Sequence, residues 1–143
     1  MKATLYAYLI IRHFEGLRLT AYRCPSGIWT IGYGHTSGVK PDDTITQSQA
    51  GELLEHDVAT VETYLNQLHL NISQNQFDAL TSFIFNIGQT AFTTSTMLKL
   101  IRKNPNDPAI AAQFSKWILS NGKVLPGLQR RREEESKLYF LDM

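Results

Sequence analysis

The sequence predicts an α+β protein that joins a small N-terminal β-hairpin or sheet to a mainly helical bundle. Strand and turn residues are confined to positions 17–36, whereas apolar residues at helical spacing fill most of the remaining chain. Strands segregated from helices in this way define the α+β class. The length of 143 residues suits one domain. We expect it to comprise a β-lobe at about 17–40 and a helical lobe at about 1–14 and 46–143.

The first expected element is a helix over residues 4–14. Apolar side chains recur there at helical spacing, and Gly16 is a natural stop for the helix. Residues 17–36 then place prolines and glycines among Tyr, Ile, Trp and Thr, a pattern that predicts short strands joined by turns.

A long helix is expected to begin after Thr46, because Thr46 and Gln49 have the spacing of a capping box. The apolar residues on one face of this helix are Leu54, Val58, Val61, Leu65 and Leu68. Further helices are expected near 74–87, 91–103, 107–120 and 126–140. Prolines 105 and 108 separate two of these helices, and Asn121-Gly122 is expected to end another. We expect Met97, Leu98 and Ile101 in the core.

Composition excludes several classes of protein. Apolar residues make up 43% of the chain, enough for a core, and the net charge of +1 gives no reason to expect a nucleic-acid partner. The one cysteine cannot form an internal disulfide, and no cofactor or metal site is expected. The apolar run at 5–11 is far shorter than the roughly 20 residues that span a membrane, and it lacks the cleavage site of a signal peptide.

Glu15 is a candidate general acid. It lies at the C-terminal end of the first expected helix, where the partial negative charge of the helix disfavours a carboxylate. Its neighbours Phe14 and Leu17 add desolvation, which also favours the neutral acid. The alternative is a solvated glutamate at a helix end, the commoner fate of such a residue.

Cys24 and Thr30 are the other two candidates for chemistry. A thiol beside the cationic Arg23 is expected to have a lowered pKa, although a lone cysteine is more often a small buried hydrophobe. Strand alternation directs Thr30 away from Trp29 and Ile31, although threonine is also an ordinary strand residue.

The spacing of these three residues resembles the phage-type lysozymes, glycoside hydrolase family 24. Glu15, eight residues, Cys24, five residues and Thr30 match the catalytic pattern E-x8-(D/C)-x5-T of that family, within EGLRLTAY and WTIGYGHT. Later stretches also look like landmarks of the family: FNIG at 85–88, AFTTST at 91–96, Trp117 and GKVLPGLQRRREEE at 122–135. The similarity covers nearly the whole chain and implies a lysozyme-like fold.

The resemblance implies an endolysin muramidase that hydrolyses the β-1,4 bond between N-acetylmuramic acid and N-acetylglucosamine in peptidoglycan, with inversion at the anomeric carbon. Glu15 corresponds to the general acid, and Thr30 to the residue that positions the attacking water. Cys24 occupies a position usually held by aspartate, which stabilises the oxocarbenium-like transition state or assists the water. The alternatives are a lytic transglycosylase acting on the same bond and a catalytically silent wall-binding module.

Supporting residues follow from the same comparison. His35 and Asp57 are expected to lie within salt-bridge distance and tie the β-lobe to the long helix. One arginine of Arg130, Arg131 and Arg132 is expected to orient Glu15; the alternative is a solvated basic face paired with the glutamates that follow it. Phe85 and Ser95 are candidates for lining a substrate cleft, whereas Phe92 and Trp117 are expected in the core.

The resemblance also implies a biological context. The protein is expected to be made in the cytoplasm of a phage-infected or lysogenic bacterium and to act later on the periplasmic cell wall. We expect a monomer without stable membrane insertion. Because the chain starts almost directly at the catalytic helix, release is expected to depend on a separate membrane-permeabilising protein, a holin.

Overall fold

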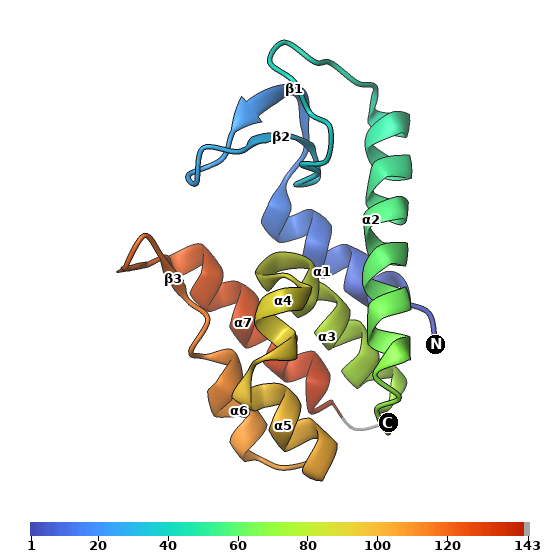
Figure 1. Cartoon of the computed structure of the whole chain (residues 1–143), viewed down its shortest axis with the longest axis vertical. Coiled ribbons are helices and arrows are strands. Elements are labelled where there is room, and N and C mark those ends of the chain that lie inside the picture. Colours follow the sequence, from blue (N-terminus) through green and yellow to red (C-terminus); the bar gives the residue numbers. More distant parts are fainter. Residues whose placement is uncertain (142–143) are drawn as a thin grey trace.

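The computed structural model describes residues 1–141, which form seven helices and four short strands (Figure 1). The predicted helical lobe runs to residue 143, but 142 and 143 lie outside the described residues. The predicted α+β class is confirmed, because a small antiparallel sheet near the N-terminus is followed mainly by helices. Within residues 1–141, no helix is both long enough and apolar enough to cross a membrane.

The β-lobe follows the first helix, α1 (Leu5–Glu15). Strand β1 (Arg18–Arg23) pairs antiparallel with β2 (Trp29–Gly32), and the register shifts between Arg18 and Tyr22. The lobe extends past its predicted limit at residue 40, because the backbone near Thr44 also pairs with β1 through a bridge to Thr20.

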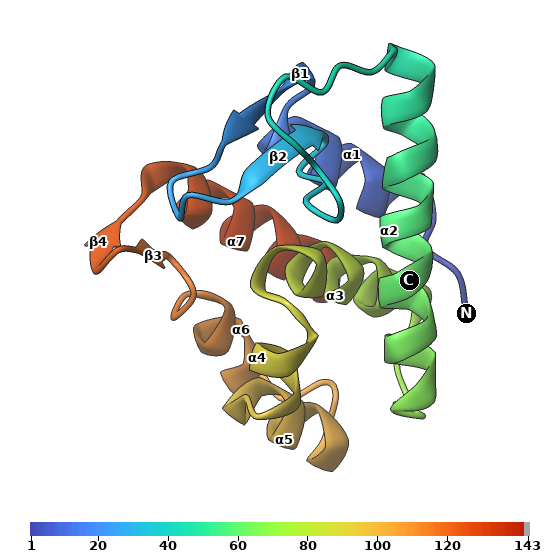
Figure 2. The ribbon, with the colours of Figure 1, turned by 45° about the horizontal axis from the view of Figure 1, so that its top comes forward.

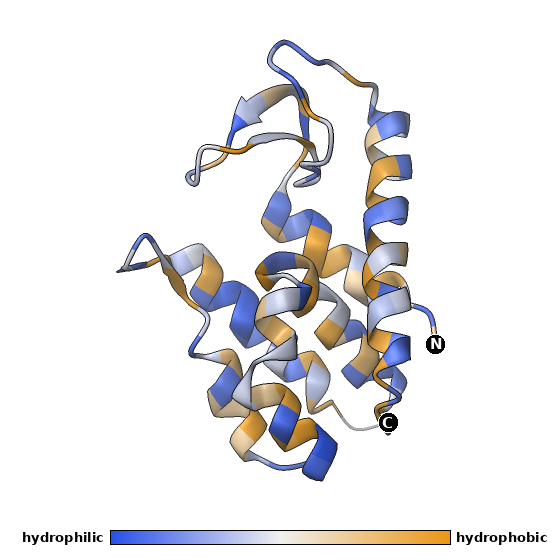
Figure 3. Ribbon diagram, in the orientation of Figure 1, coloured by the Kyte–Doolittle hydropathy of each residue, from blue (hydrophilic) through white to orange (hydrophobic). Residues whose placement is uncertain are grey.

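Helix α2 (Gln47–Gln67) runs from the β-lobe along the side of the helical lobe (Figure 1). The predicted capping box of Thr46 and Gln49 is present in full. Apolar and polar stretches alternate along α2 in Figure 3, as expected for a helix with one buried face. Leu68 caps the helix, and the other four predicted apolar residues are buried together with Ala50.

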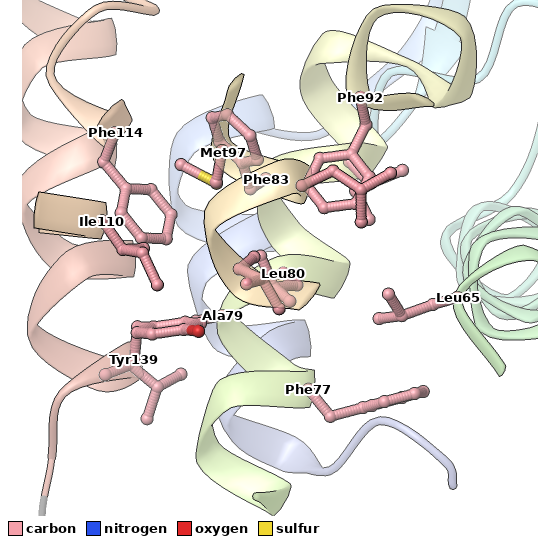
Figure 4. Packing of buried hydrophobic residues seen from close by; sticks show 14 of the residues in the cluster. Leu65, Phe77, Ala79, Leu80, Phe83, Phe92, Met97, Ile110, Phe114 and Tyr139 are labelled. Atoms are coloured by element: carbon pink, nitrogen blue, oxygen red, sulfur yellow. The ribbon is translucent and has the colours of Figure 1, made fainter. Parts of the chain in front are cut away.

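The core of the helical lobe is built around α3 (Gln74–Ile87), in which every residue from 76 to 84 is buried. Phe83 is central: its ring makes edge-to-face contacts with Phe92 and Phe114 (Figure 4). It makes a third such contact with Trp117. The last helix, α7 (Pro126–Tyr139), packs against α3. Met97, Leu98 and Ile101 are buried, as predicted.

The predicted helix at 91–103 is wrong in its continuity. The chain forms α4 (Gln89–Thr93) and α5 (Thr96–Lys103), because Ser95 adopts an extended conformation and caps α5 by accepting a hydrogen bond from the Leu98 N–H. Consecutive hydroxyl residues at 93–96 offer the backbone such alternatives to a continuous helix.

The predicted helix at 107–120 is wrong in its second half. Helix α6 covers only Ala109–Phe114, and β3 (Leu119–Ser120) pairs with β4 (Lys123–Val124). Asn121 and Gly122 do not end a helix: both have positive φ, 52° and 78°, as the two central residues of a type I′ hairpin turn require. The β3–β4 hairpin projects on the same side of the molecule as the loop between β1 and β2 (Figures 1 and 2).

Candidate active site

Glu15 is the last residue of α1, and Gly16 ends the helix with a φ of 71°. The Glu15 side chain is only 19% exposed, and its Oε2 accepts a hydrogen bond of 2.6 Å from Nη1 of Arg131 on α7. The predicted contact between an arginine of the 130–132 run and Glu15 is therefore made by Arg131. The positive charge of Arg131 therefore lies beside a carboxyl group that also stands at the negative end of the α1 dipole.

The alternative of a solvated basic face does not hold for two of the three arginines. Arg131 and Arg132 are each 2% exposed and both bind the buried carboxylate of Glu135. Arg130 is exposed, and it lines a groove with Leu9 and His13 instead of facing Glu15. The helical spacing of α7 explains the difference, because successive residues point in directions about 100° apart.

Gly34 allows the β-lobe to approach Glu15 closely. Its φ is +78°, and a Cβ at this position would lie 2.6 Å from Oε1 of Glu15. A side chain here meets both backbone strain and the carboxylate itself. The absence of a side chain at Gly34 therefore leaves room for the carboxyl group of Glu15.

Cys24 lies in the turn between β1 and β2, where its Sγ is 2.9 Å from the hydroxyl of Ser26. This hydrogen bond is the largest of several effects that lower the pKa of the Cys24 thiol to about 7. The expected lowering is thus present, but its cause differs from the predicted one. The guanidinium of Arg23 lies over the ring of Trp29, 5.2 Å from the ring centroid.

Thr30 lies on β2 and is 3% exposed. Its hydroxyl donates a hydrogen bond of 2.9 Å to the carbonyl of Ile28, and the same carbonyl accepts one of 3.0 Å from the N–H of Cys24. One backbone oxygen therefore holds both candidate residues. Because the Thr30 proton is donated to Ile28, the hydroxyl oxygen keeps a lone pair with which to accept a hydrogen bond.

His35 and Asp57 are in contact, as predicted. Nδ1 of His35 lies 2.7 Å from Oδ2 of Asp57, and Nε2 lies 2.9 Å from the carbonyl oxygen of Ser37. The pair joins the loop after β2 to the middle of α2, so it ties the β-lobe to the helix that runs beside it.

Three cavities surround these residues. One of about 340 Å³ is lined by Phe14, Glu15, Asn86 and Arg131, among others. A second, of about 490 Å³, shares Asn86 and lies between the two hairpins, with Ser26 on one side and Leu119 on the other.

The third cavity, of about 420 Å³, is lined by both His35 and Asp57, and the predicted cleft residue Phe85 lies in its wall. Ser95 lines none of the three cavities, because its hydroxyl is engaged in capping α5. Trp117, expected in the core, packs against the core and also lines the second cavity. Within residues 1–141, no group of three or more His, Cys, Asp or Glu side chains is arranged to hold a metal ion.

A model of the phage lysozyme family matches residues 12–135. This chain belongs to the phage lysozyme family.

Relatives of the family support this assignment along the whole chain. The sequence is 48% identical over 136 residues to an endolysin from Acyrthosiphon pisum secondary endosymbiont phage 1, and the match covers 92% of each protein. It is 42% identical over 134 residues to an endolysin of Bacillus phage PZA, in which 91% of this chain matches about half (52%) of the relative. The muramidase domain of SpmX from Asticaccaulis excentricus has the same fold, with a TM-score of 0.88, 37% identity and 99% coverage of both chains.

Several residues of this phage lysozyme site were not identified from the sequence. Ser26, Ser82 and Glu135 contact the candidate residues, but serines in turns and helices have many other roles. Glu135 did carry a signal, since it follows Arg132 and Arg131 by three and four residues, the spacing of paired charges on a helix. The sequence pattern did not reveal that this pair is buried.

Proposed function

We propose that this chain is an endolysin muramidase that hydrolyses the β-1,4 bond between N-acetylmuramic acid and N-acetylglucosamine in peptidoglycan. The observation that carries the proposal is the arrangement of Glu15 at a cavity beside Arg131, with Cys24 and Thr30 held by one carbonyl. Membership of the phage lysozyme family and the endolysin and muramidase relatives support it.

Each of the three residues has a distinct role in the proposed reaction. Glu15 donates a proton to the glycosidic oxygen as the bond from that oxygen to the anomeric carbon breaks. Thr30 accepts a hydrogen bond from the attacking water, whose oxygen forms the new bond to the anomeric carbon. Cys24, as a thiolate, stabilises the positive charge that develops on the sugar ring and takes up the proton that the water releases.

Digestion of purified peptidoglycan in heavy-oxygen water tests this proposal. Hydrolysis produces a reducing N-acetylmuramic acid end that carries the label, and mass spectrometry detects it. A 1,6-anhydro end without the label would instead indicate a lytic transglycosylase. The protein with Glu15→Gln is the control for background hydrolysis, and sugar binding without any product would indicate a wall-binding module.

The proposed context follows from the family resemblance. The chain is made in a bacterial cytoplasm and acts as a monomer on the cell wall after a holin has permeabilised the membrane. The endolysin relatives support the action on the wall.

The lysis rate is expected to depend on the charge of Cys24. Since the pKa of the thiol is lowered to about 7, the thiolate becomes the major form above that pH, and activity should rise as pH passes through 7. Cys24→Asp should keep substantial activity below pH 6, because aspartate ionises near pH 4. Cys24→Ala should lose most activity at every pH. Turbidity clearing of cell walls from pH 5 to 9 measures all three proteins.

Ser26→Ala tests whether the hydrogen bond from Ser26 lowers the pKa of Cys24. Loss of this hydroxyl removes the largest stabilisation of the thiolate, so the rise in activity should move to higher pH. A fully active Cys24→Ala enzyme would exclude the proposed role of the thiol.

A side chain at Gly34 is expected to displace Glu15. Gly34→Ala places a methyl group 2.6 Å from Oε1, and misplacement of a catalytic group by about 1 Å can cost roughly 10²-fold in rate. Gly38→Ala is the control, because Gly38 has a similar φ of +70° with nothing within 4 Å of an added Cβ. Cell-wall lysis by folded variants should fall only for Gly34→Ala, and an equal loss in both would assign the effect to backbone strain.

A further inference from the structure

Glu135 is a charged residue with no exposed surface, and the proposed reaction gives it no direct role. It lies on α7, one helical turn after Arg131 and four residues along the chain from it. Its carboxylate accepts hydrogen bonds from the hydroxyl of Ser82 at 2.6 Å, from Nε of Arg131 at 3.2 Å and from Nη1 of Arg132. A buried carboxylate held by this many donors is fixed in its orientation.

These contacts determine where the guanidinium of Arg131 points. Nε is bound to Glu135 and Nη2 donates to the carbonyl of Ser82 at 3.1 Å, while Nη1 reaches Glu15 at 2.6 Å. Because the guanidinium is planar and its donors have fixed directions, holding Nε and Nη2 on the buried side fixes the direction of Nη1. Glu135 and Ser82 thus aim Arg131 at Glu15.

Arg132 cannot replace Arg131 in this position. Its Nε donates to the carbonyl of Trp117 at 2.9 Å, its Nη2 binds Asn86, and its guanidinium lies over the ring of Phe83 at 5.0 Å. Its remaining contact is the carboxylate of Glu135. Each nitrogen of the Arg132 guanidinium therefore donates to a group other than Glu15.

The balance of charge also depends on Glu135. With all four groups ionised, Arg131 and Arg132 are matched by Glu15 and Glu135. When Glu15 is protonated, as a general acid must be, Glu135 still compensates one arginine. Without the charge of Glu135, the two buried arginines would have one carboxylate, that of Glu15, to compensate them.

We propose that Glu135 is a positioning residue of this enzyme, which aims Arg131 at Glu15 and balances the charge of the second buried arginine. The inference rests on the proposed role of Glu15 as the general acid. Arg131 of α7 donates a hydrogen bond to Glu15, and the charge of Glu15 also acts on Arg132 and on Tyr22 of β1. Tyr22 stays neutral in the working range, since burial first, and then the charge of Glu15, raises its pKa.

Glu135→Gln tests the proposal, because glutamine keeps the size of the side chain and removes its charge. The pH profile of lysis should move to lower pH by about one unit, the size of shift that a neighbouring charge produces. Glu134→Gln is the matched control: it makes the same change one residue earlier, at a side chain that is 53% exposed and faces Lys137. Its profile should remain that of the unmodified protein.

A second measurement does not depend on activity. In protein labelled with nitrogen-15 at arginine, the Nε–H of Arg131 should exchange slowly with solvent, and Glu135→Gln should accelerate that exchange while Glu134→Gln does not. Because Glu135 is fully buried, Glu135→Gln can fail to fold; Ser82→Ala then serves, since it removes one hydrogen bond to Glu135 and leaves all charges in place. It should accelerate the same exchange by a smaller factor.

Two results would overturn the proposal: a folded Glu135→Gln protein with an unchanged pH profile, or unchanged exchange at Arg131 in both variants. Failure of the proposed function has a different signature, because an active Glu15→Gln enzyme would remove the role of Glu15 and leave the exchange result as it is.

Discussion

Glu15→Gln is expected to reduce cell-wall lysis by about 10²–10⁴-fold, the usual contribution of a general acid. Glutamine has nearly the same shape and can still accept the hydrogen bond from Nη1 of Arg131, so the fold should persist. What it lacks is a proton that can be transferred to the glycosidic oxygen. The initial rate of turbidity loss with purified cell walls measures the effect.

Glu52→Gln is the control for this loss, since Glu52 is exposed on α2 and the change in charge is the same. It should lyse walls at the original rate. The melting temperature of both variants should be recorded, so that an inactive protein can be distinguished from an unfolded one. Folded Glu15→Gln protein that retains a tenth or more of the rate would contradict the proposed role.

Phe83→Ala is expected to lower the free energy of unfolding by about 3–5 kcal/mol, the range found for large aromatic side chains removed from a core. Phe83 has no exposed surface, its ring contacts three other aromatic rings edge to face, and Arg132 lies over it. The substitution therefore removes packing in the core and one support of the buried arginine.

Denaturant unfolding followed by circular dichroism measures the loss. Tyr6→Ala is the matched control, because Tyr6 is an aromatic residue 58% exposed on α1. Its effect should lie within about 0.5 kcal/mol, as is usual for surface substitutions. Similar losses for the two variants would mean that the core around Phe83 contributes no more than the surface does.

The fold was predictable from the sequence wherever a local signal agreed with long-range packing. The capping box at Thr46 and the glycine after Glu15 mark real helix ends, because these signals act within one helical turn. The predictions were wrong at 91–103 and 107–120, where hydroxyl side chains and an Asn-Gly pair permit more than one local structure. At Asn121-Gly122, pairing between 119–120 and 123–124 selects the hairpin, and this pairing is not visible in helical periodicity.

The candidate site was predictable only in part. Spacing and resemblance identified Glu15, Cys24 and Thr30, and they anticipated the contacts of His35 with Asp57 and of an arginine with Glu15. The burial of Arg131 and Arg132 was not predictable, because it depends on α3 and α7 packing over 49 residues of sequence separation. The cause of the lowered pKa of Cys24 was also missed, because it depends on which way a turn directs Ser26 and Arg23.

The shared carbonyl of Ile28 joins the backbone of residue 24 to the hydroxyl of Thr30. The backbone N–H of residue 24 and the hydroxyl of Thr30 meet at this oxygen, and any residue other than proline supplies that N–H. Exchange of the thiol for a carboxyl therefore leaves this backbone link to Thr30 in place. In an engineered enzyme, position 24 is thus a place to adjust the proposed pH dependence by choice of side chain, with this backbone link retained.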